Sequence, residues 1–443
     1  MEFSSLVFLL ILIPFITLIS YLIKDNRNRN IILIIFSLIF IGYYQINYLI
    51  MYIILMLATY YFGIMLEKNR KIVIIYIGLI LFILFSFKYY NLINIVIDKN
   101  ILNLIMPLGL SFFTFTSIGY VIDVYKEVIK PEKNIINFFV FNSLFAVFIS
   151  GPIIKYSDVK NDIHDRTINL DYLAIGLRRF IIGLGKKTII ANNLAIIVDY
   201  AFNFDGIYNW QISLLAGIGF TLQIYYDFSG YSDMAIGLCN MLGFNNIKEN
   251  FNYPYISSSI SEFWRRWHIS LGRFFKDYVY IPLGGNRVTN TRMILNLFIV
   301  WLLTGIWHGN TIVFIIWGMF HFIIIIFEKF IKLPKYIGYI YVIPLTIIGW
   351  IIFNSSDVNQ MYIILRGLLN FNVFYNSQFF LYSGILYLMP LVLISIIGST
   401  PIVIKILNKI NINIFDIYLI FILGLSVMMI INNSFESSIY FQF

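Results

Sequence analysis

Two histidines could do chemistry, and one of them stands in a stretch so apolar that an imidazole adds little to packing. His308 lies in GIWHG, between Gly305 and Gly309, inside a run rich in isoleucine, leucine, phenylalanine and tryptophan. Glycines on both sides let a ligand or another backbone approach closely. An imidazole with an ordinary pKa of about 6.5 is suited to take a proton from a hydroxyl. These surroundings predict that His308 is a general base, with a hydrogen-bonded core histidine as the alternative.

The second histidine, His268, belongs to the basic and aromatic stretch FWRRWHISLGRFFKDYVYIPLGGNR, residues 263–287. On a helical wheel of residues 262–278, charged side chains fall on one side and aromatic ones on the other. This pattern predicts one amphipathic helix in a membrane interface, where its charged face would serve as an anchor. His268 falls on the apolar face, and its surroundings fit a structural and a functional histidine equally well.

The basic stretch ends in a turn. Pro282 cannot continue the helix, and we expect Gly284 and Gly285 to adopt positive φ. Consecutive backbone N–H groups beside Arg287 would then be candidates for cradling a phosphate.

Two carboxylates lie upstream in a mostly apolar setting. Asp227 and Asp233 belong to LQIYYDFSGYSDMAIGL. Buried carboxylates need partners, and Arg265, Arg266 or a histidine would serve. The alternative is that both acids cap helices around a Gly-Ser break.

The other two histidines fit structural roles better. His164 lies in the polar loop NDIHDRT, which predicts a solvated surface residue, and His321 lies between two phenylalanines, which predicts a core residue. The ionisable residues lack metal-ligand spacing such as HExxH, and there is no GxSxG elbow, so the sequence favours neither a metal enzyme nor a serine hydrolase.

Composition defines the elements that must hold these residues. The 443 residues are 60% hydrophobic and only 12% charged, whereas soluble domains are about 25% charged. This predicts an all-α polytopic membrane protein with roughly 10 to 12 transmembrane helices in one domain, residues 1–443. The single cysteine, Cys239, excludes an intrachain disulfide framework. The net charge of +9 indicates attraction to anionic lipid and not to nucleic acid.

Basic loops at 24–29 and 68–71 predict cytoplasmic turns and an external N-terminus. Between them, residues 31–66 are too long for one span, so we expect two helices that turn near 44–47. Part of 172–198 is expected at the interface because of its arginines and lysines. Besides the first helix, we expect spans near 72–90, 101–124, 137–155, 207–228, 293–307, 311–330, 336–353, 381–399 and 414–432.

With these motifs in view, the chain resembles the membrane-bound O-acyltransferase (MBOAT) superfamily. Within it the chain is similar to the bacterial alginate and peptidoglycan O-acetyltransferases, with the D-alanyl transfer protein of teichoic acid synthesis as a more distant relative. The matching stretches cover about residues 100–330: MPLGLSFFTFTSIGYVIDVY (106–125), FAVFISGPIIKYSD (145–158), YYDFSGYSDMAIGL (225–238), SEFWRRWHISL with KDYVYIPLGGNR (261–287), and GIWHG with WGMFH (305–321).

The resemblance implies roles for particular residues. His308, in the WHG motif, would be the catalytic base, and His268, in WRRWH, would orient or polarise a thioester carbonyl. The fold implied is a ring of transmembrane and interfacial helices around a central funnel. Cations of the basic helix would attract the phosphates of the acyl donor. The candidates for binding donor or substrate are Arg265, Arg266, Arg273, Lys276, Arg287, Trp264, Asp227, Asp233 and Asn310.

The reaction implied moves an acetyl group from cytoplasmic acetyl-CoA, a substrate and not a bound cofactor, to an extracellular polysaccharide or cell-wall glycan. The protein would be a multi-pass protein of the bacterial plasma membrane, with an SGNH-type acetyltransferase as its external partner. Three alternatives are a flippase for a lipid-linked sugar, D-alanyl transfer to teichoic acid and a structural subunit of a glycan-export complex. Transporters often consist of two related halves, and the sequence shows no such internal symmetry, which argues against the flippase alternative.

Overall fold

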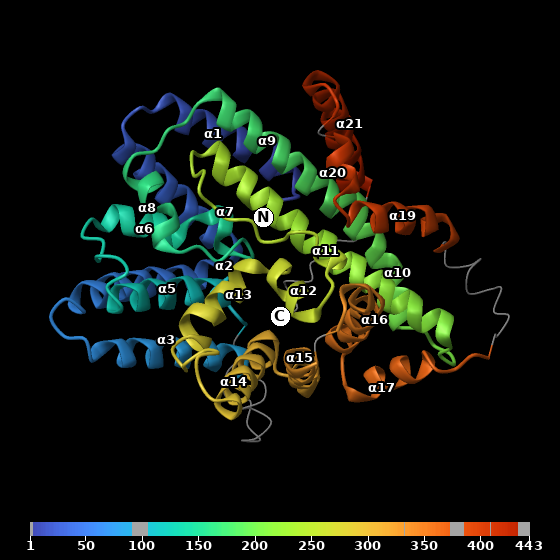
Figure 1. Ribbon diagram of the computed structural model, residues 1–443. Helices are drawn as coiled ribbons and strands as arrows, with labels where there is room; N and C mark the ends of the chain where they lie inside the picture. Colours follow the sequence, from blue (N-terminus) through green and yellow to red (C-terminus); the bar gives the residue numbers. More distant parts are fainter. Residues whose placement is uncertain (1–2, 91–104, 332, 373–384, 408, 433–443) are drawn as a thin grey trace. The chain divides into compact units, whose positions relative to one another are not determined.

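The computed structural model describes residues 3–90, 105–331, 333–372, 385–407 and 409–432 (Figure 1). Helices are the regular structure throughout these residues. Six of the described helices are long and apolar enough to cross a membrane: Asn26–Met65, Leu170–Phe202, Asn290–His308, Ile312–Phe330, Lys335–Asn354 and Ile412–Asn432. Four shorter apolar helices are Phe8–Leu22, Ile72–Lys88, Leu110–Tyr125 and Tyr387–Gly398. The prediction of a polytopic, all-helical membrane protein is confirmed.

Backbone contacts divide the chain into two compact units, each built from two separate stretches of sequence. Unit 1 comprises Met1–Ile181 and Tyr231–Glu249, and unit 2 comprises Ile182–Gly230 and Asn250–Phe443.

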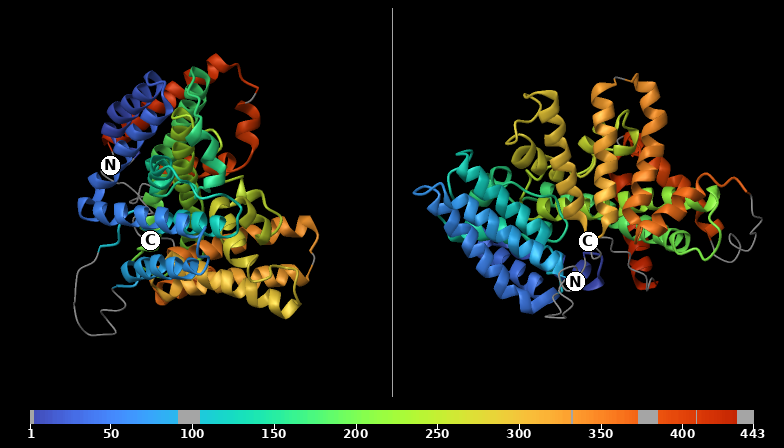
Figure 2. Two further views of the ribbon diagram at one scale, coloured as in Figure 1. Left: turned by 90° about the vertical axis from the view of Figure 1, so that its left-hand side faces the viewer. Right: turned by 90° about the horizontal axis from the view of Figure 1, so that it is seen from below.

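Unit 1 contains the helices of the N-terminal part. They are η1 (Phe8–Leu12), α1 (Ile13–Leu22), α2 (Asn26–Met65), α3 (Ile72–Lys88), α5 (Leu110–Tyr125), α6 (Ile135–Ser143), α7 (Phe145–Phe148), α8 (Tyr156–His164), and parts of α9 (Leu170–Gly185) and α11 (Trp210–Met241). Helix α2 packs against α6 and α5, and α3 packs against α5 (Figure 2).

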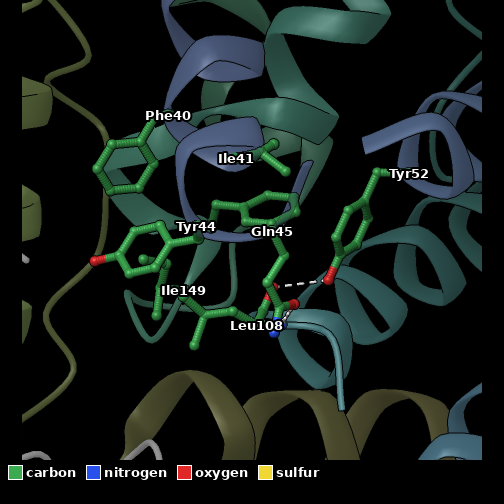
Figure 3. A pocket seen from close by; sticks show the side chains of 8 residues that line it. Phe40, Ile41, Tyr44, Gln45, Tyr52, Leu108 and Ile149 are labelled. Atoms are coloured by element: carbon green, nitrogen blue, oxygen red, sulfur yellow. Dashed lines mark hydrogen bonds between the residues drawn. The ribbon is translucent and has the colours of Figure 1, made fainter. Parts of the chain in front are cut away.

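The predicted turn inside residues 31–66 corresponds to a break in α2 at Gln45, whose φ of −154° and ψ of 81° are not helical. The Oε1 atom of Gln45 accepts a hydrogen bond from the Leu108 N–H at 3.1 Å, and the Tyr52 hydroxyl donates to the Leu108 carbonyl at 2.7 Å. Figure 3 shows these side chains converging on Leu108. Leu108, just before α5, thus binds the side chain at the break and a side chain of the helix that follows it.

The span expected at 137–155 is wrong. Two short helices, α6 and α7, occupy this stretch, separated by Leu144 with φ −51° and ψ 100°. The residues around the break are buried in protein, which is where a membrane protein tolerates irregular backbone. Hydropathy alone does not distinguish such a buried broken segment from a spanning helix.

Unit 2 contains the remaining helices. They are η2 (Lys186–Ala191), α10 (Asn192–Phe202), η3 (Pro254–Ile256), α12 (Ile260–Arg266), α13 (Ile269–Phe275), η4 (Lys276–Tyr280), α14 (Asn290–His308), α15 (Ile312–Phe330), α16 (Lys335–Asn354), α17 (Val358–Gly367), α19 (Ile385–Gly398), α20 (Ile402–Leu407) and α21 (Ile412–Asn432). The spans expected at 293–307, 311–330, 336–353 and 414–432 match α14, α15, α16 and α21. Residues 101–104 and 381–384 of two other expected spans lie outside the described residues.

Helices α14 and α15 form a close hairpin, which Figures 1 and 2 show beside α16. Glycines make the approach possible. A Cβ atom on Gly318 would come within 2.5 Å of the Trp301 carbonyl oxygen, and one on Gly305 within 2.6 Å of the Phe314 carbonyl oxygen. Helix α14 ends at His308, at the turn of the hairpin. The close packing of α14 on α15 therefore determines where that imidazole lies.

The glycine contact predicts a stability effect. Gly318→Ala should push the two helices apart and destabilise the protein by about 1–3 kcal/mol, as overpacking does. Thermal unfolding in detergent should show a lower Tm. The control is Gly424→Ala in α21, where a Cβ atom would meet nothing within 4 Å. An unchanged Tm for Gly318→Ala would contradict the close contact.

Candidate active site

Residues 262–278 form two helices and not the single amphipathic helix that was expected. Helix α12 ends at Arg266 and α13 begins at Ile269. Between them, His268 has φ 43° and ψ 55°, in the left-handed region. Few residues other than glycine adopt this conformation, and it is strained unless the surroundings stabilise it. The wheel pattern failed because it assumed a continuous helix.

A short segment that precedes η3 stabilises this break. The Asn250 carbonyl accepts the Ile269 N–H at 2.9 Å, and the Asn252 N–H donates to the Arg266 carbonyl at 2.9 Å. The buried side chain of Asn250 also takes part, since its Oδ1 atom accepts the Ser270 N–H at 3.1 Å and the Ser270 hydroxyl at 2.9 Å. Sequence reasoning missed Asn250, because several asparagines lie between 245 and 252 and nothing distinguishes this one.

The start of α12 is held by a carboxylate from another helix. Glu328 of α15 accepts hydrogen bonds from the N–H groups of Ile260 and Ser261. It also accepts the Tyr341 hydroxyl at 2.6 Å. Two of the orphan N–H groups of α12 are thereby satisfied, and α12 is tied to α15 and α16. The sequence offered no signal for this role, because an acid at the end of an apolar helix resembles an ordinary interfacial charge.

Six of the chain's seven tryptophans gather in one aromatic cluster of unit 2. Ring centroids lie 5.5 Å apart for Trp264 and Trp317, and 4.8 Å apart for Trp267 and Trp350. The cluster consists of Trp264, Trp267, Trp301, Trp307, Trp317 and Trp350, with Phe353 and the three histidines of this unit against them. Of the tryptophans, sequence reasoning singled out Trp264 as a site residue.

His308 is the last residue of α14 and borders this aromatic cluster. Its ring centroid lies 4.9 Å from that of Trp317 and 5.0 Å from that of Phe353, both edge to face. The side chain is partly exposed. The imidazole is therefore surrounded by aromatic rings and still accessible, as a proton-transfer group must be.

Trp307 brings the two signature histidines together. Its ring centroid is 4.6 Å from that of His308 and 6.5 Å from that of His268. The two imidazoles can be no farther apart than the sum of these distances. The fold thus brings near each other two imidazoles from segments 40 residues apart along the chain.

His268 is only 4% exposed, and the ring of Phe228 packs on it edge to face at 4.6 Å. Burial lowers the pKa of His268 to about 3. The imidazole is therefore neutral at pH 7.

The two histidines expected to be structural differ from each other. His321 is buried, its Nδ1 atom lies 2.9 Å from the Trp317 carbonyl oxygen, and its ring stacks on Trp301, which agrees with a core residue. His164 is 44% exposed as expected, but its Nε2 atom also lies 2.7 Å from a Glu132 oxygen in unit 1.

The two upstream acids have partners other than those expected. Asp227 forms a buried ion pair with Lys187, and Asp233 pairs with Arg179 at 2.9 Å. Both acids lie inside the continuous helix α11, so the helix-capping alternative is wrong. Lys187 and Arg179 lie in the stretch 172–198 whose charges suggested an interface. Here those charges offset the buried carboxylate of Asp227 and the partly buried one of Asp233.

The predicted donor-binding cations fall into two groups. Arg265, Lys276 and Arg287 are exposed, and no ion pair involves them within the described residues. Arg266 pairs with Glu262 at 2.9 Å. Burial acts to raise the pKa of Glu262, but hydrogen bonds from Ser258 and Arg266 outweigh it and lower the pKa. Two further candidates are the half-buried Arg273 and the exposed Asn310, in the turn after His308.

The glycine turn differs from the phosphate cradle that was expected. Gly284 and Gly285 have positive φ, 107° and 59°, as predicted. Their N–H groups, however, donate to the carbonyls of Ile281 and Tyr280, each at 2.9 Å, and the Arg287 N–H donates to the Gly284 carbonyl. Because these donors are used within the turn, a phosphate contact here would depend on the Arg287 side chain.

This arrangement is that of a multi-helix membrane protein with two histidines in an aromatic cluster at the end of an apolar helical hairpin. Residues 73–334 match the model of the membrane-bound O-acyltransferase family. The chain belongs to this family, and it is an O-acyltransferase.

Curated relatives agree with this assignment. The chain is 35% identical to the probable alginate O-acetylase AlgI of Pseudomonas aeruginosa, over 85% of this chain and 76% of the relative. It is 30% identical to the peptidoglycan O-acetyltransferase of Helicobacter pylori, over 79% of this chain and 75% of the relative. A teichoic acid D-alanyltransferase of Bacillus subtilis is 30% identical over 53% of this chain and 63% of the relative.

The Lys187–Asp227 pair generates a prediction. Their side chains are 8% and 4% exposed, and breaking a buried pair by removing one partner costs about 3–5 kcal/mol. Lys187→Met should therefore lower the Tm strongly, and adding Asp227→Leu should restore most of it. Lys329→Met, at an exposed lysine, is the control. A double variant no more stable than Lys187→Met would contradict a dominant role for this pair.

Proposed function

We propose that this O-acyltransferase moves an acetyl group from cytoplasmic acetyl-CoA to an acceptor on the outer side of the bacterial plasma membrane, for O-acetylation of an extracellular polysaccharide or cell-wall glycan. The observation that carries the proposal is the position of His308, partly exposed at the end of the α14–α15 hairpin and surrounded by aromatic rings. A basic group there can accept a proton from a hydroxyl bound among the aromatic rings.

The relatives support acetyl as the group transferred. The alginate and peptidoglycan O-acetylases match about four fifths of this chain, and the D-alanyltransferase about half. The external acceptor and an SGNH-type partner that would pass acetyl to the glycan are part of the same proposal.

In the proposed reaction, His308 takes the proton from an acceptor hydroxyl as its oxygen attacks the thioester carbon. The tetrahedral intermediate then collapses with cleavage of the carbon–sulfur bond, and the imidazolium returns its proton to the leaving sulfur, which yields the acetyl ester and free CoA thiol. His308 can take part in both steps because it is the last residue of α14 and its side chain is partly exposed. General base catalysis of this kind contributes about 10²–10⁴-fold.

The catalytic role of His308 is tested by His308→Gln, which keeps a polar side chain and removes the basic nitrogen. Purified protein should bind acetyl-CoA with similar affinity and lose at least about 10²-fold in kcat for CoA release or acetyl transfer. His164→Gln, in unit 1, is the control, and His321→Gln should also lose far less. Near wild-type turnover by His308→Gln would overturn the mechanism.

Donor binding predicts a salt effect. Exposed Arg265 and Lys276 would attract CoA phosphates by interactions that salt screens. Arg265→Gln with Lys276→Gln should raise the KM for acetyl-CoA and reduce its dependence on ionic strength. The control, Lys24→Gln with Arg27→Gln, removes the same charge from exposed positions in the first basic loop. Equal effects of the two double variants would mean that the basic stretch contributes only general charge.

A further inference from the structure

The hydrogen bonds around His268 determine which of its ring nitrogens carries the proton. Asn250 Oδ1 lies 3.2 Å from His268 Nδ1. The same oxygen accepts the Ser270 backbone N–H at 3.1 Å. A backbone N–H can only donate, so the amide of Asn250 must present its oxygen, and not its NH₂ group, to this position.

An oxygen that can only accept requires a donor opposite it. His268 Nδ1 must therefore carry the proton, because an unprotonated Nδ1 would place two lone pairs against each other. The Ser270 hydroxyl, 2.9 Å from the Asn250 oxygen and 3.5 Å from Nδ1, fits the same pattern as a donor to Oδ1. Since a neutral imidazole has one N–H, the other nitrogen, Nε2, holds a lone pair.

The backbone prevents the imidazole from leaving this arrangement easily. His268 sits in the left-handed conformation at the break between α12 and α13, and the Asn250 carbonyl binds the next N–H, that of Ile269. Asn250 is 1% exposed. One residue thus fixes both the backbone and the ring of His268.

We propose that Asn250 is a positioning residue that holds His268 as the neutral Nδ1–H tautomer, so that His268 meets the substrate as a hydrogen-bond acceptor through Nε2. This inference rests on the proposed function for the identity of the substrate. It changes the role expected from the family resemblance, because a neutral Nε2 without a proton cannot polarise a thioester carbonyl. A substrate group that binds Nε2 would instead have to donate the hydrogen bond, as the attacking hydroxyl or an amide N–H of the acyl donor can. Burial of His268 agrees with this assignment, because it disfavours the doubly protonated ring.

Nitrogen-15 NMR of histidine-labelled protein in detergent reads the tautomer directly. The chain has four histidines, and His268→Gln identifies the signals of His268 by their loss. The expected result at pH 7 is a protonated Nδ1 and an unprotonated Nε2. A proton on Nε2 would overturn the proposal. This reading needs no turnover, so a wild-type protein that shows the Nδ1–H tautomer but transfers no acetyl group would refute the proposed function and leave the tautomer assignment intact.

Variants of Asn250 test the positioning role. Asn250→Leu should abolish the preference for the Nδ1–H tautomer. It should also lower kcat about tenfold or more, as loss of a partner that orients a histidine does elsewhere. The KM for acetyl-CoA should change less than about twofold. Asn250→Asp keeps an acceptor oxygen and should keep the Nδ1 proton. Asn252→Leu, at an exposed asparagine of the same segment, should change neither reading. The assignment to Asn250 is wrong if Asn250→Leu retains the Nδ1–H tautomer, or if Asn252→Leu loses it equally. If the Asn250→Leu protein does not fold, the wild-type and Asn250→Asp spectra decide.

Discussion

Residues 260–275 break between helices α12 and α13, and the break leaves backbone N–H and carbonyl groups without helical partners. These groups lie among aromatic side chains, so other groups of the protein must form hydrogen bonds with them. Asn250 and Asn252 bind the groups on either side of His268, and Glu328 binds the first N–H groups of α12. An unsatisfied polar group in such surroundings costs several kcal/mol. At the Gln45 break in unit 1, Leu108 binds the side chains of Gln45 and Tyr52. In both units, a residue distant in the sequence holds the segment at the break by hydrogen bonds.

The surroundings of His268 and His308 differ, and they give the two imidazoles different chemical properties. His268 is buried, neutral and held by Asn250. His308 is partly exposed at the end of α14, with Trp317 and Phe353 edge to face against it. One imidazole is therefore suited to accept a hydrogen bond and the other to accept a proton. Glycines at 305 and 318 bring α14 and α15 close enough for Trp317 to pack against His308. The surroundings of this imidazole therefore depend on residues that have no side chain to contribute.

Much of this could be predicted from residue type and local pattern. The apolar runs indicated α14, α15, α16 and α21, the length of 31–66 indicated the break at Gln45, and WRRWH with WHG indicated the histidine pair. Long-range partners could not be predicted. Lys187 and Asp227 are 40 positions apart, and nothing local couples them. Asn250, Glu328 and Trp350 contribute through contacts that only the folded chain creates. The wheel of 262–278 failed for a related reason, since the hydrogen bonds that favour the left-handed His268 come from residues outside the window.

The central claim is that the acyl carbon of the donor reaches His308 within the aromatic cluster of unit 2. Bromoacetyl-CoA tests this claim most directly, because a nucleophile beside the acyl group displaces bromide and forms a stable carbon–nitrogen bond. After labelling of the purified protein, peptide mass spectrometry should find the modification on His308, acetyl-CoA should protect against it, and His308→Gln should abolish it. Labelling that acetyl-CoA prevents but that falls on His164 or another residue far from the cluster, with His308 unmodified, would contradict the account.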